Sequence, residues 1–209
     1  MLRTDLKLYL VTDRSFLHGR NLIDVVMQAV AGGVTMVQLR EKDIDTRTFI
    51  ELGFELKRNL QQVNIPLIIN DRVDVAMAID ADGVHIGQSD MPYSLARRIL
   101  GSNKIIGLSV ENIDEVIKAN SFDVDYIGIS PVFTTYTKTD TAQPFGLSGL
   151  REAIRLSVHP TVAIGGINLQ TKQDVLNCGT DGIAVVSAIM AAENPQKAAK
   201  DLQFGGLVV

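Results

Sequence analysis

Two aspartates of the sequence follow consecutive apolar runs, and together they could bind a divalent cation. Asp71 comes directly after Leu67–Asn70, and Asp90 comes soon after Gly83–Ile86. The segment between the runs has helix-spaced apolar residues, so the pattern predicts two parallel strands whose carboxyl ends lie on the same rim. Mg²⁺ is usually held by one or two carboxylates and by substrate phosphates, which makes this pair a candidate magnesium site. The alternative is that Asp71 only caps the following helix and Asp90 lies in an ordinary turn.

Cationic side chains that could bind an anion follow other apolar runs. Arg40 and Lys42 come after Met36–Leu39, and Lys138 lies among several hydroxyl side chains in a long loop after Tyr126–Ile129. A diphosphate requires positive charge of this kind, because charge-assisted hydrogen bonds to its oxygens are the strong ones. We therefore predict that these three cations face a diphosphate.

The elements that must position these side chains form a regular alternation. Eight short apolar runs alternate with helix-spaced segments, without a linker or a low-complexity break. Such an alternation indicates an α/β protein with a parallel sheet, and eight units indicate a closed (β/α)₈ TIM barrel. The 209 residues suffice for one domain, so we expect a single TIM-barrel domain over residues 1–209. The predicted strands are Leu8–Val11, Met36–Leu39, Leu67–Asn70, Gly83–Ile86, Ile105–Leu108, Tyr126–Ile129, Val162–Ile164 and Ile183–Val186.

A helix is expected after each strand, which makes eight. The later ones are predicted over Glu111–Ala119, about Leu150–Leu156, Asp174–Asn177 and roughly Pro195–Leu202. An open doubly wound sheet is the competing architecture. The first turn, however, lacks the G-x-G-x-x-G pattern of dinucleotide-binding folds.

A second anion site is predicted after the seventh and eighth strands. Gly165-Gly166 and Val186-Ser187 occupy the places where many barrels bind a phosphate group. Glycine allows backbone N–H groups to approach an anion, and a following helix adds a favourable dipole. The alternative for the glycine pair is a tight turn. His85 lies inside a predicted strand, where a hydrogen-bonded core histidine is favoured over an acid–base role.

Composition and charge exclude some partners. The formal net charge of -4 argues against nucleic acid, which requires a basic face. No signal-peptide layout is present, and the longest apolar run, Ile183–Ala192, is about half of the ~20 residues that a membrane span needs. Cys178 is the single cysteine, so no disulfide can form within the chain. We therefore expect a cytoplasmic protein that binds small molecules.

Six motifs, in chain order and each at a strand exit, resemble those of thiamine-phosphate synthases. The likeness runs from about Leu8 to Ala192. One departure is Tyr136, where that family more often has a small residue or proline. The motifs are QLREK at Gln38–Lys42, IND at Ile69–Asp71, HIGQSD at His85–Asp90, TKTD at Thr137–Asp140, AIGGI at Ala163–Ile167 and VVSAI at Val185–Ile189.

The resemblance implies a transferase that joins 4-amino-2-methyl-5-(diphosphooxymethyl)pyrimidine to 4-methyl-5-(2-phosphooxyethyl)thiazole. The products would be thiamine phosphate and pyrophosphate, and the mechanism would be dissociative. The implied cofactor is Mg²⁺, held by Asp71 and Asp90, and the implied catalytic cations are Lys138, Arg40 and Lys42. The implied substrate-binding residues are Gln38, Leu39, Arg40, Glu41, Lys42, Asn70, Ser109, Thr135, Tyr136, Thr137, Lys138, Gly166, Val186 and Ser187.

Two other functions are weighed against this one. A thiazole tautomerase is a related barrel that acts on the thiazole phosphate without a diphosphate substrate, so it would not need Asp71, Asp90 and Lys138 together. A non-catalytic barrel that binds a thiazole or thiamine phosphate could keep Gly166 and Ser187 while losing the carboxylates and cations. The presence of both groups of residues favours the synthase.

Overall fold

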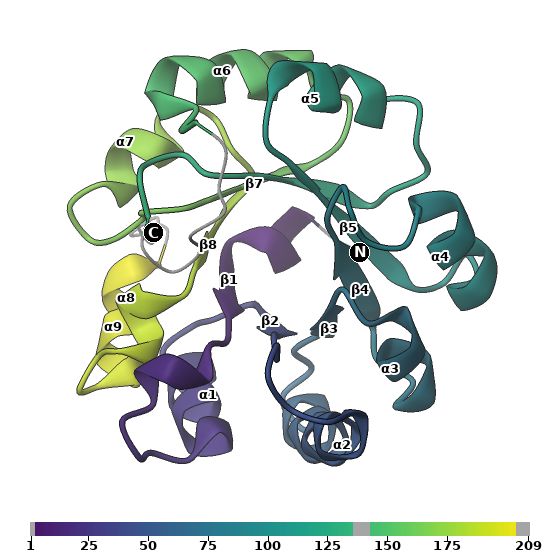
Figure 1. Cartoon of the computed structure of the whole chain (residues 1–209). Helices are drawn as coiled ribbons and strands as arrows, with labels where there is room; N and C mark the ends of the chain where they lie inside the picture. The colour runs from purple at the N-terminus through teal and green to yellow at the C-terminus, as the bar shows by residue number, and fades with distance from the viewer. Residues whose placement is uncertain (1–2, 136–142, 204–209) are drawn as a thin grey trace.

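The eight apolar runs form parallel strands that close into a barrel, with helices around the outside (Figure 1). The computed structural model describes residues 3–135 and 143–203. Neighbouring strands pair in chain order, and the eighth returns to the first, where Leu8 aligns with Ile183. The predicted (β/α)₈ barrel is therefore confirmed. The strands are β1 Leu8–Val11, β2 Met36–Leu39, β3 Leu67–Asn70, β4 Gly83–Ile86, β5 Ile105–Val110, β6 Tyr126–Ile129, β7 Thr161–Ile164 and β8 Gly182–Val185.

The helices of the described residues cover the outer face of the barrel (Figure 1). None of them combines the length and the apolar character that a membrane crossing requires. The short 3-10 helices are η1 Arg3–Leu6 and η2 Arg14–Phe16. The α-helices are α1 Leu22–Ala31, α2 Thr46–Gln61, α3 Val73–Ala78, α4 Tyr93–Leu100, α5 Ile113–Ala119, α6 Gly146–Leu156, α7 Lys172–Leu176, α8 Ser187–Met190 and α9 Pro195–Leu202.

Some element bounds differ from the sequence prediction. The fifth strand continues to Val110, so Ser109 lies within it rather than after it. The eighth strand ends at Val185, and Ser187 begins α8, a short helix that the sequence pattern did not predict. Over the described residues there are consequently nine α-helices instead of eight. Single turns of helix carry too few residues to show a 3.6-residue period, which explains why α8 was missed.

Alternation along each strand separates two cores. Outward-facing residues such as Leu8 and Leu10 pack against the helices, whereas inward-facing residues such as Tyr9 and Val11 fill the barrel. The inner cluster is apolar towards the amino-terminal end of the barrel, where Met36 is fully buried. Several other inward positions carry polar side chains, and these form the floor of the cavity described below.

A repeated hydrogen bond closes the amino-terminal end of the barrel. The residue just before each even-numbered strand accepts a backbone N–H from the start of the preceding odd-numbered strand. These contacts satisfy donors that would otherwise be buried at the ends of the strands. The acceptors Thr35, Asp82, Asp125 and Asp181 bind the N–H groups of Leu8, Leu67, Ile106 and Thr161 at 3.0, 2.8, 2.8 and 2.9 Å.

Candidate active site

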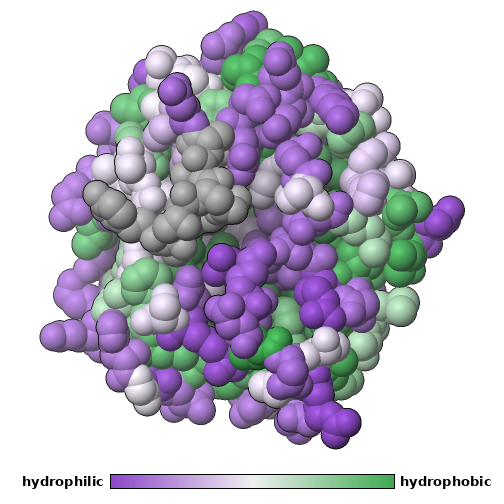
Figure 2. Space-filling model, viewed as in Figure 1, coloured by the Kyte–Doolittle hydropathy of each residue, from purple (hydrophilic) through white to green (hydrophobic). Residues whose placement is uncertain are grey.

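A cavity of about 630 Å³ lies at the carboxyl ends of the strands. Its size is typical of sites that hold small molecules. Hydrophilic side chains gather around a hollow near the centre of the face seen in Figure 2. Most of the predicted site residues line the cavity: Gln38, Arg40, Lys42, Asn70, Asp71, Asp90, Ser109, Thr135, Gly166, Val186 and Ser187.

The other predicted residues divide into two groups. Tyr136, Thr137 and Lys138 lie outside the described residues. Leu39 is fully buried in the outer core, and the Glu41 side chain pairs with Arg14, so neither is among the residues that line the cavity. Leu39 and Glu41 face away from the cavity because successive side chains of an extended chain point to opposite sides.

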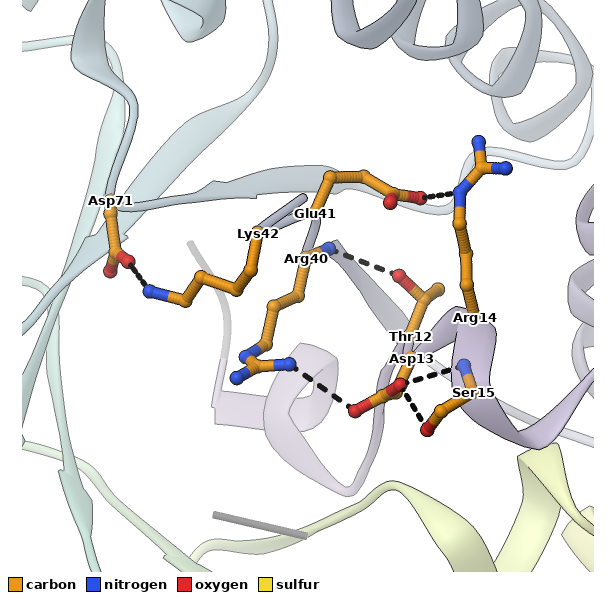
Figure 3. A network of polar contacts seen from close by, with 8 residues as sticks. All are labelled: Thr12, Asp13, Arg14, Ser15, Arg40, Glu41, Lys42 and Asp71. Atoms are coloured by element: carbon orange, nitrogen blue, oxygen red, sulfur yellow. Dashed lines mark hydrogen bonds and ion pairs between the residues drawn. The ribbon is translucent and has the colours of Figure 1, made fainter. Parts of the chain in front are cut away.

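Gln38, Arg40 and Lys42 share the inner face of β2 and its extension because they are separated by two residues. Arg40 continues the strand geometry, since its backbone N–H donates to Thr12 Oγ1 at 3.0 Å. The intervening Leu39 and Glu41 face the other side. Figure 3 shows Arg40 and Lys42 extending away from the Glu41 side chain, which points to Arg14.

Two crossed ion pairs connect the segment after β2 with the loop after β1. Arg40 Nη1 donates to Asp13 Oδ2 at 3.2 Å, and Arg14 Nε donates to Glu41 Oε1 at 2.7 Å (Figure 3). Burial raises the pKa of Glu41, and the ion pair with Arg14 offsets only part of this effect. The loop after β1 is thereby held against the loop after β2. The sequence carries no signal for these pairings.

Asp71 turns into the cavity through an unusual backbone conformation. Its φ of 60° lies in the left-handed region, which aspartate tolerates better than most residues. In a regular strand the side chains of the consecutive residues Asn70 and Asp71 would point to opposite faces of the sheet. Both nevertheless line the cavity. The N-cap of α3 is Arg72, without a side-chain capping bond. The alternative that Asp71 caps this helix is therefore wrong.

Asp71 and Asp90 face each other at the exits of β3 and β4. Asp71 Oδ2 accepts a hydrogen bond of 2.5 Å from Lys42 Nζ, and the two carboxyl groups are also hydrogen-bonded to each other. Burial raises the pKa of Asp90, and the adjacent charge of Asp71 raises it further. Burial acts in the same direction on Asp71, but the hydrogen bonds from Lys42 and Asp90 lower its pKa. Asp90 therefore binds a proton more readily than Asp71 does.

The donor set suits a hard divalent cation. Two carboxylates that face one another form half of an Mg²⁺ site, because this ion keeps waters and phosphate oxygens as its other ligands. Asp90 Oδ2 also accepts the Gly87 N–H at 2.7 Å, which fixes the carboxyl group in its loop. Among the described residues, no group of three or more Asp, Glu, His or Cys side chains forms a metal cluster.

The two glycines after β7 form a tight turn, as the alternative interpretation of the sequence predicted, and they also line the cavity. Gly165 and Gly166 have φ values of 104° and 69°, so they form a turn that other residues would strain. A Cβ atom on Gly166 would lie 2.8 Å from Cβ of Phe133, so the loop also packs closely. Both glycines line the cavity opposite the carboxylates' loops, together with Val186 and Ser187.

The cavity floor contains residues that sequence analysis missed. The inward-facing Tyr9 and Tyr126 lie in strands that the sequence predicts as apolar, but their hydroxyl groups are hydrogen-bonded to each other at 2.9 Å. His85 Nδ1 lies 2.9 Å from Tyr126 Oη, and its Nε2 lies 2.8 Å from Ser109 Oγ. The predicted hydrogen bonds of His85 are confirmed, but its side chain is only partly buried and lines the cavity instead of lying in the core. A signal was available, because all three residues occupy inward positions of predicted strands.

A closed (β/α)₈ barrel with a charged cavity at the carboxyl ends of its strands defines the class of the protein, which is a TIM-barrel enzyme. A family model described as thiamine monophosphate synthase matches residues 8–189. The chain therefore belongs to the thiamine monophosphate synthase family, and it is a transferase.

Individual relatives agree with the family model. A thiamine-phosphate synthase of Clostridium novyi (strain NT) is 52% identical over 196 residues, which cover 94% of this chain and 96% of the relative. The corresponding enzyme of Albidiferax ferrireducens is 53% identical over 198 residues, covering 95% of this chain and 90% of the relative. The solved structure of thiamine phosphate pyrophosphorylase from Pyrococcus furiosus is similar with a TM-score of 0.89 and 42% identity, over 97% of this chain and 96% of that one.

Proposed function

We propose that the enzyme condenses 4-amino-2-methyl-5-(diphosphooxymethyl)pyrimidine with 4-methyl-5-(2-phosphooxyethyl)thiazole. The products are thiamine phosphate and pyrophosphate, and the reaction requires Mg²⁺. One observation carries the proposal: the facing carboxylates of Asp71 and Asp90 share a cavity mouth with Arg40 and Lys42. Family membership supports the substrates, and this convergence supports a diphosphate leaving group.

The balance of charge at this mouth supports the metal requirement. Arg40 and Lys42 are both paired with carboxylates, and Asp90 adds a further acidic group beside Asp71. An anionic diphosphate would be repelled by the aspartates unless a divalent cation neutralised them. Bound between Asp71 and Asp90, Mg²⁺ would stabilise the negative charge that develops on the departing pyrophosphate.

The residues of the chain orient the reacting groups. Arg40 and Lys42 would bind the diphosphate oxygens and hold the leaving group in line, and Lys138 would join them from the loop after β6. Gln38 and Ser109 on the cavity floor would bind the pyrimidine. In the dissociative reaction the carbon–oxygen bond breaks first, and the electron-rich aminopyrimidine stabilises the resulting methylene cation. Such chemistry needs charge stabilisation and positioning more than a general base.

The opposite wall would bind the second substrate. Thr135, Gly166, Val186 and Ser187 line that side of the cavity. Family membership supports a role in binding the same substrate for Tyr136 and Thr137, which lie outside the described residues. A phosphate held there would direct the thiazole nitrogen towards the methylene carbon. The cytoplasm, where phosphorylated precursors would be available, is the proposed location.

Two alternative functions remain distinguishable by their chemistry. A thiazole tautomerase would convert the thiazole phosphate without pyrimidine diphosphate and without a metal. A non-catalytic binding protein would bind thiamine phosphate or thiazole phosphate but turn over neither. The carboxylate pair beside Lys42 favours the synthase over both, because neither alternative has a diphosphate to stabilise.

The test combines purified protein, both phosphorylated precursors and Mg²⁺, with thiamine phosphate and pyrophosphate as the measured products. We expect both products in equal amounts and none after chelation of the metal. The double variant Asp71→Asn, Asp90→Asn is expected to abolish the Mg²⁺-dependent activity. Unchanged metal dependence in that variant would refute the metal site, and isomerisation of the thiazole alone would establish the tautomerase.

A further inference from the structure

A partly buried arginine outside the cavity connects two short helices that are far apart in the sequence. Arg20 lies between η2 and α1, and it is not among the residues that line the cavity. Its guanidinium group donates to the carbonyl oxygens of Leu17 and Phe16, both at 3.0 Å, and to that of Ala192 at 2.5 Å. It also donates to the carbonyl oxygen of Met190. The side chain therefore bridges the end of η2 and the end of α8.

The end of a helix needs a partner of this kind. The last carbonyl groups of a helix have no N–H partner within it, and their oxygens carry partial negative charge. A guanidinium group is a planar cation with several N–H donors, so it can bind carbonyl oxygens of two segments at once. Arg20 supplies such donors to Met190 and Ala192 at the end of α8.

The position of α8 depends on its contacts with the rest of the protein. A helix of four residues, Ser187–Met190, is far too short to be stable by itself. Ile189 and Met190 are fully buried, but apolar contacts are non-directional, whereas hydrogen bonds have a preferred geometry. Among the described residues, the side-chain hydrogen bonds that reach residues 186–192 come from Arg20. Arg20 is therefore the side chain that sets the position and rotation of this turn.

The other end of the same turn faces the cavity. Val186 is the N-cap of α8 and Ser187 is its first residue, and both line the cavity. The Met190 N–H donates to the Val186 carbonyl oxygen at 2.9 Å, and the Met190 carbonyl oxygen accepts from Arg20. Because the turn is one hydrogen-bonded unit, a displacement at its Arg20 end would also move Ser187.

The loop after β1, which Arg20 also contacts, is held by other bonds. Asp13 accepts the Ser15 N–H at 2.9 Å at the start of η2, and it pairs with Arg40 at 3.2 Å. Neither contact involves Arg20. Loss of Arg20 should therefore disturb α8 more than the segment that carries Arg40.

We propose that Arg20 is a positioning residue that holds Val186 and Ser187 in place for the phosphate group of the thiazole substrate. This inference rests on the proposed function, in which Ser187 binds that phosphate. Arg20 does not line the cavity, so it acts through the backbone of α8. Its loss should weaken binding of thiazole phosphate and leave binding of pyrophosphate with Mg²⁺ close to the wild-type value.

The first experiment measures, by calorimetry, the dissociation constants of 4-methyl-5-(2-phosphooxyethyl)thiazole and of pyrophosphate with Mg²⁺. Arg20→Met removes the N–H donors and keeps an unbranched side chain of similar length. We expect thiazole phosphate to bind roughly ten- to a hundredfold more weakly, and pyrophosphate to change by less than about threefold, because a small displacement acts on the site that it moves.

Arg97→Met is the matched control. Arg97 also donates to carbonyl oxygens, those of Gly101 at 3.1 Å and Lys104 at 2.6 Å, but it lies on α4 and does not line the cavity. This variant should keep both affinities.

The two ligands separate positioning from a merely structural role, because general damage to the fold would weaken both together. An Arg20→Met protein that binds thiazole phosphate as the wild type does, or that loses both ligands equally, would overturn the inference. If Arg20→Met does not fold, Arg20→Lys takes its place, since lysine keeps the charge but not the planar fork. We expect the same selective loss, by roughly threefold or more, and wild-type affinity for thiazole phosphate would overturn the inference.

The second experiment needs no ligand. Amide hydrogen exchange over residues 186–192, followed by mass spectrometry, should be faster in Arg20→Met than in the wild type by about tenfold or more. It should be unchanged in Arg97→Met. Wild-type exchange in Arg20→Met would overturn the inference.

The failure of the proposed function would have a different signature. If the wild type forms no thiamine phosphate from its precursors, the function is wrong, even where exchange in α8 responds to Arg20→Met. If the wild type forms the product but Arg20→Met binds thiazole phosphate normally, the function stands and the role of Arg20 is wrong.

Discussion

Binding of a divalent cation should compete with protonation of Asp90. Burial and the adjacent Asp71 charge raise the pKa of Asp90, whereas the pKa of Asp71 is lowered by the hydrogen bond from Lys42 despite burial. A cation between the two carboxylates needs both of them ionised. Its affinity should therefore depend on pH above the range in which an ordinary exposed aspartate titrates.

The direction and size of the effect follow from this linkage. Above the raised pKa of Asp90 the pair is ionised and the affinity is constant. As the pH falls through that pKa, one proton competes with the metal, and the apparent association constant drops about tenfold, or about 1.4 kcal/mol, per pH unit. Asp90→Asn removes one charged ligand, so it should weaken binding by roughly tenfold or more. The variant should also lose the pH dependence in this range, because the remaining Asp71 has a lowered pKa.

The assay measures the concentration of free Mn²⁺ by electron paramagnetic resonance in titrations of the substrate-free protein at a series of pH values. Competition with Mg²⁺ then gives the affinity for Mg²⁺. Asp74→Asn is the matched control. Asp74 is an exposed aspartate of α3 that pairs with Arg72 and does not line the cavity. Wild type and control should show the same pH-dependent loss. A flat wild-type profile, or an Asp90→Asn profile parallel to that of the wild type, would refute protonation of Asp90 as the competitor of the metal.

Three other predictions concern separate parts of the molecule. Lys138→Ala should lower kcat by about 10²–10³, by analogy with the loss of a donor that stabilises developing charge; steady-state turnover near the wild-type level would remove Lys138 from the reaction. Ser187→Ala should weaken binding of the thiazole phosphate by about 1–3 kcal/mol, measured by titration, and an unchanged dissociation constant would place the phosphate elsewhere. Asp82→Ala deletes the acceptor of the Leu67 N–H and should lower the free energy of unfolding by about 1.5–3 kcal/mol in a urea titration, with activity retained; equal stability would show that this bond is replaceable.

Much of the barrel could be predicted because strand sequences are short, apolar and bounded by polar residues. The predicted bounds of β1, β2, β3, β4 and β6 are those of the structure. Errors arose where polar residues continue a strand, as Ser109 does in β5, or where one turn of helix follows directly, as at Ser187. In both places the polar residue was interpreted as part of a loop, although Ser109 belongs to β5 and Ser187 belongs to α8.

The residues of the site were predictable to the extent that strand geometry fixes them. The alternation of side chains along β2 could have excluded Leu39 and Glu41 from the cavity, because the flanking Gln38 and Arg40 face inward. After β3 the same rule fails, because the left-handed backbone conformation of Asp71 interrupts the alternation. Contacts between distant strands, such as Tyr9 with Tyr126, have no signal in a single sequence. They depend on the diameter of the closed barrel and on the space left by strand glycines.

The most direct test of the account is a crystal structure of the protein with pyrophosphate and Mg²⁺. We expect one metal ion between the carboxylates of Asp71 and Asp90, with diphosphate oxygens bound to the metal, to Arg40 and to Lys42. Pyrophosphate bound away from these cations, or a metal ion that contacts neither aspartate, would contradict the proposed site.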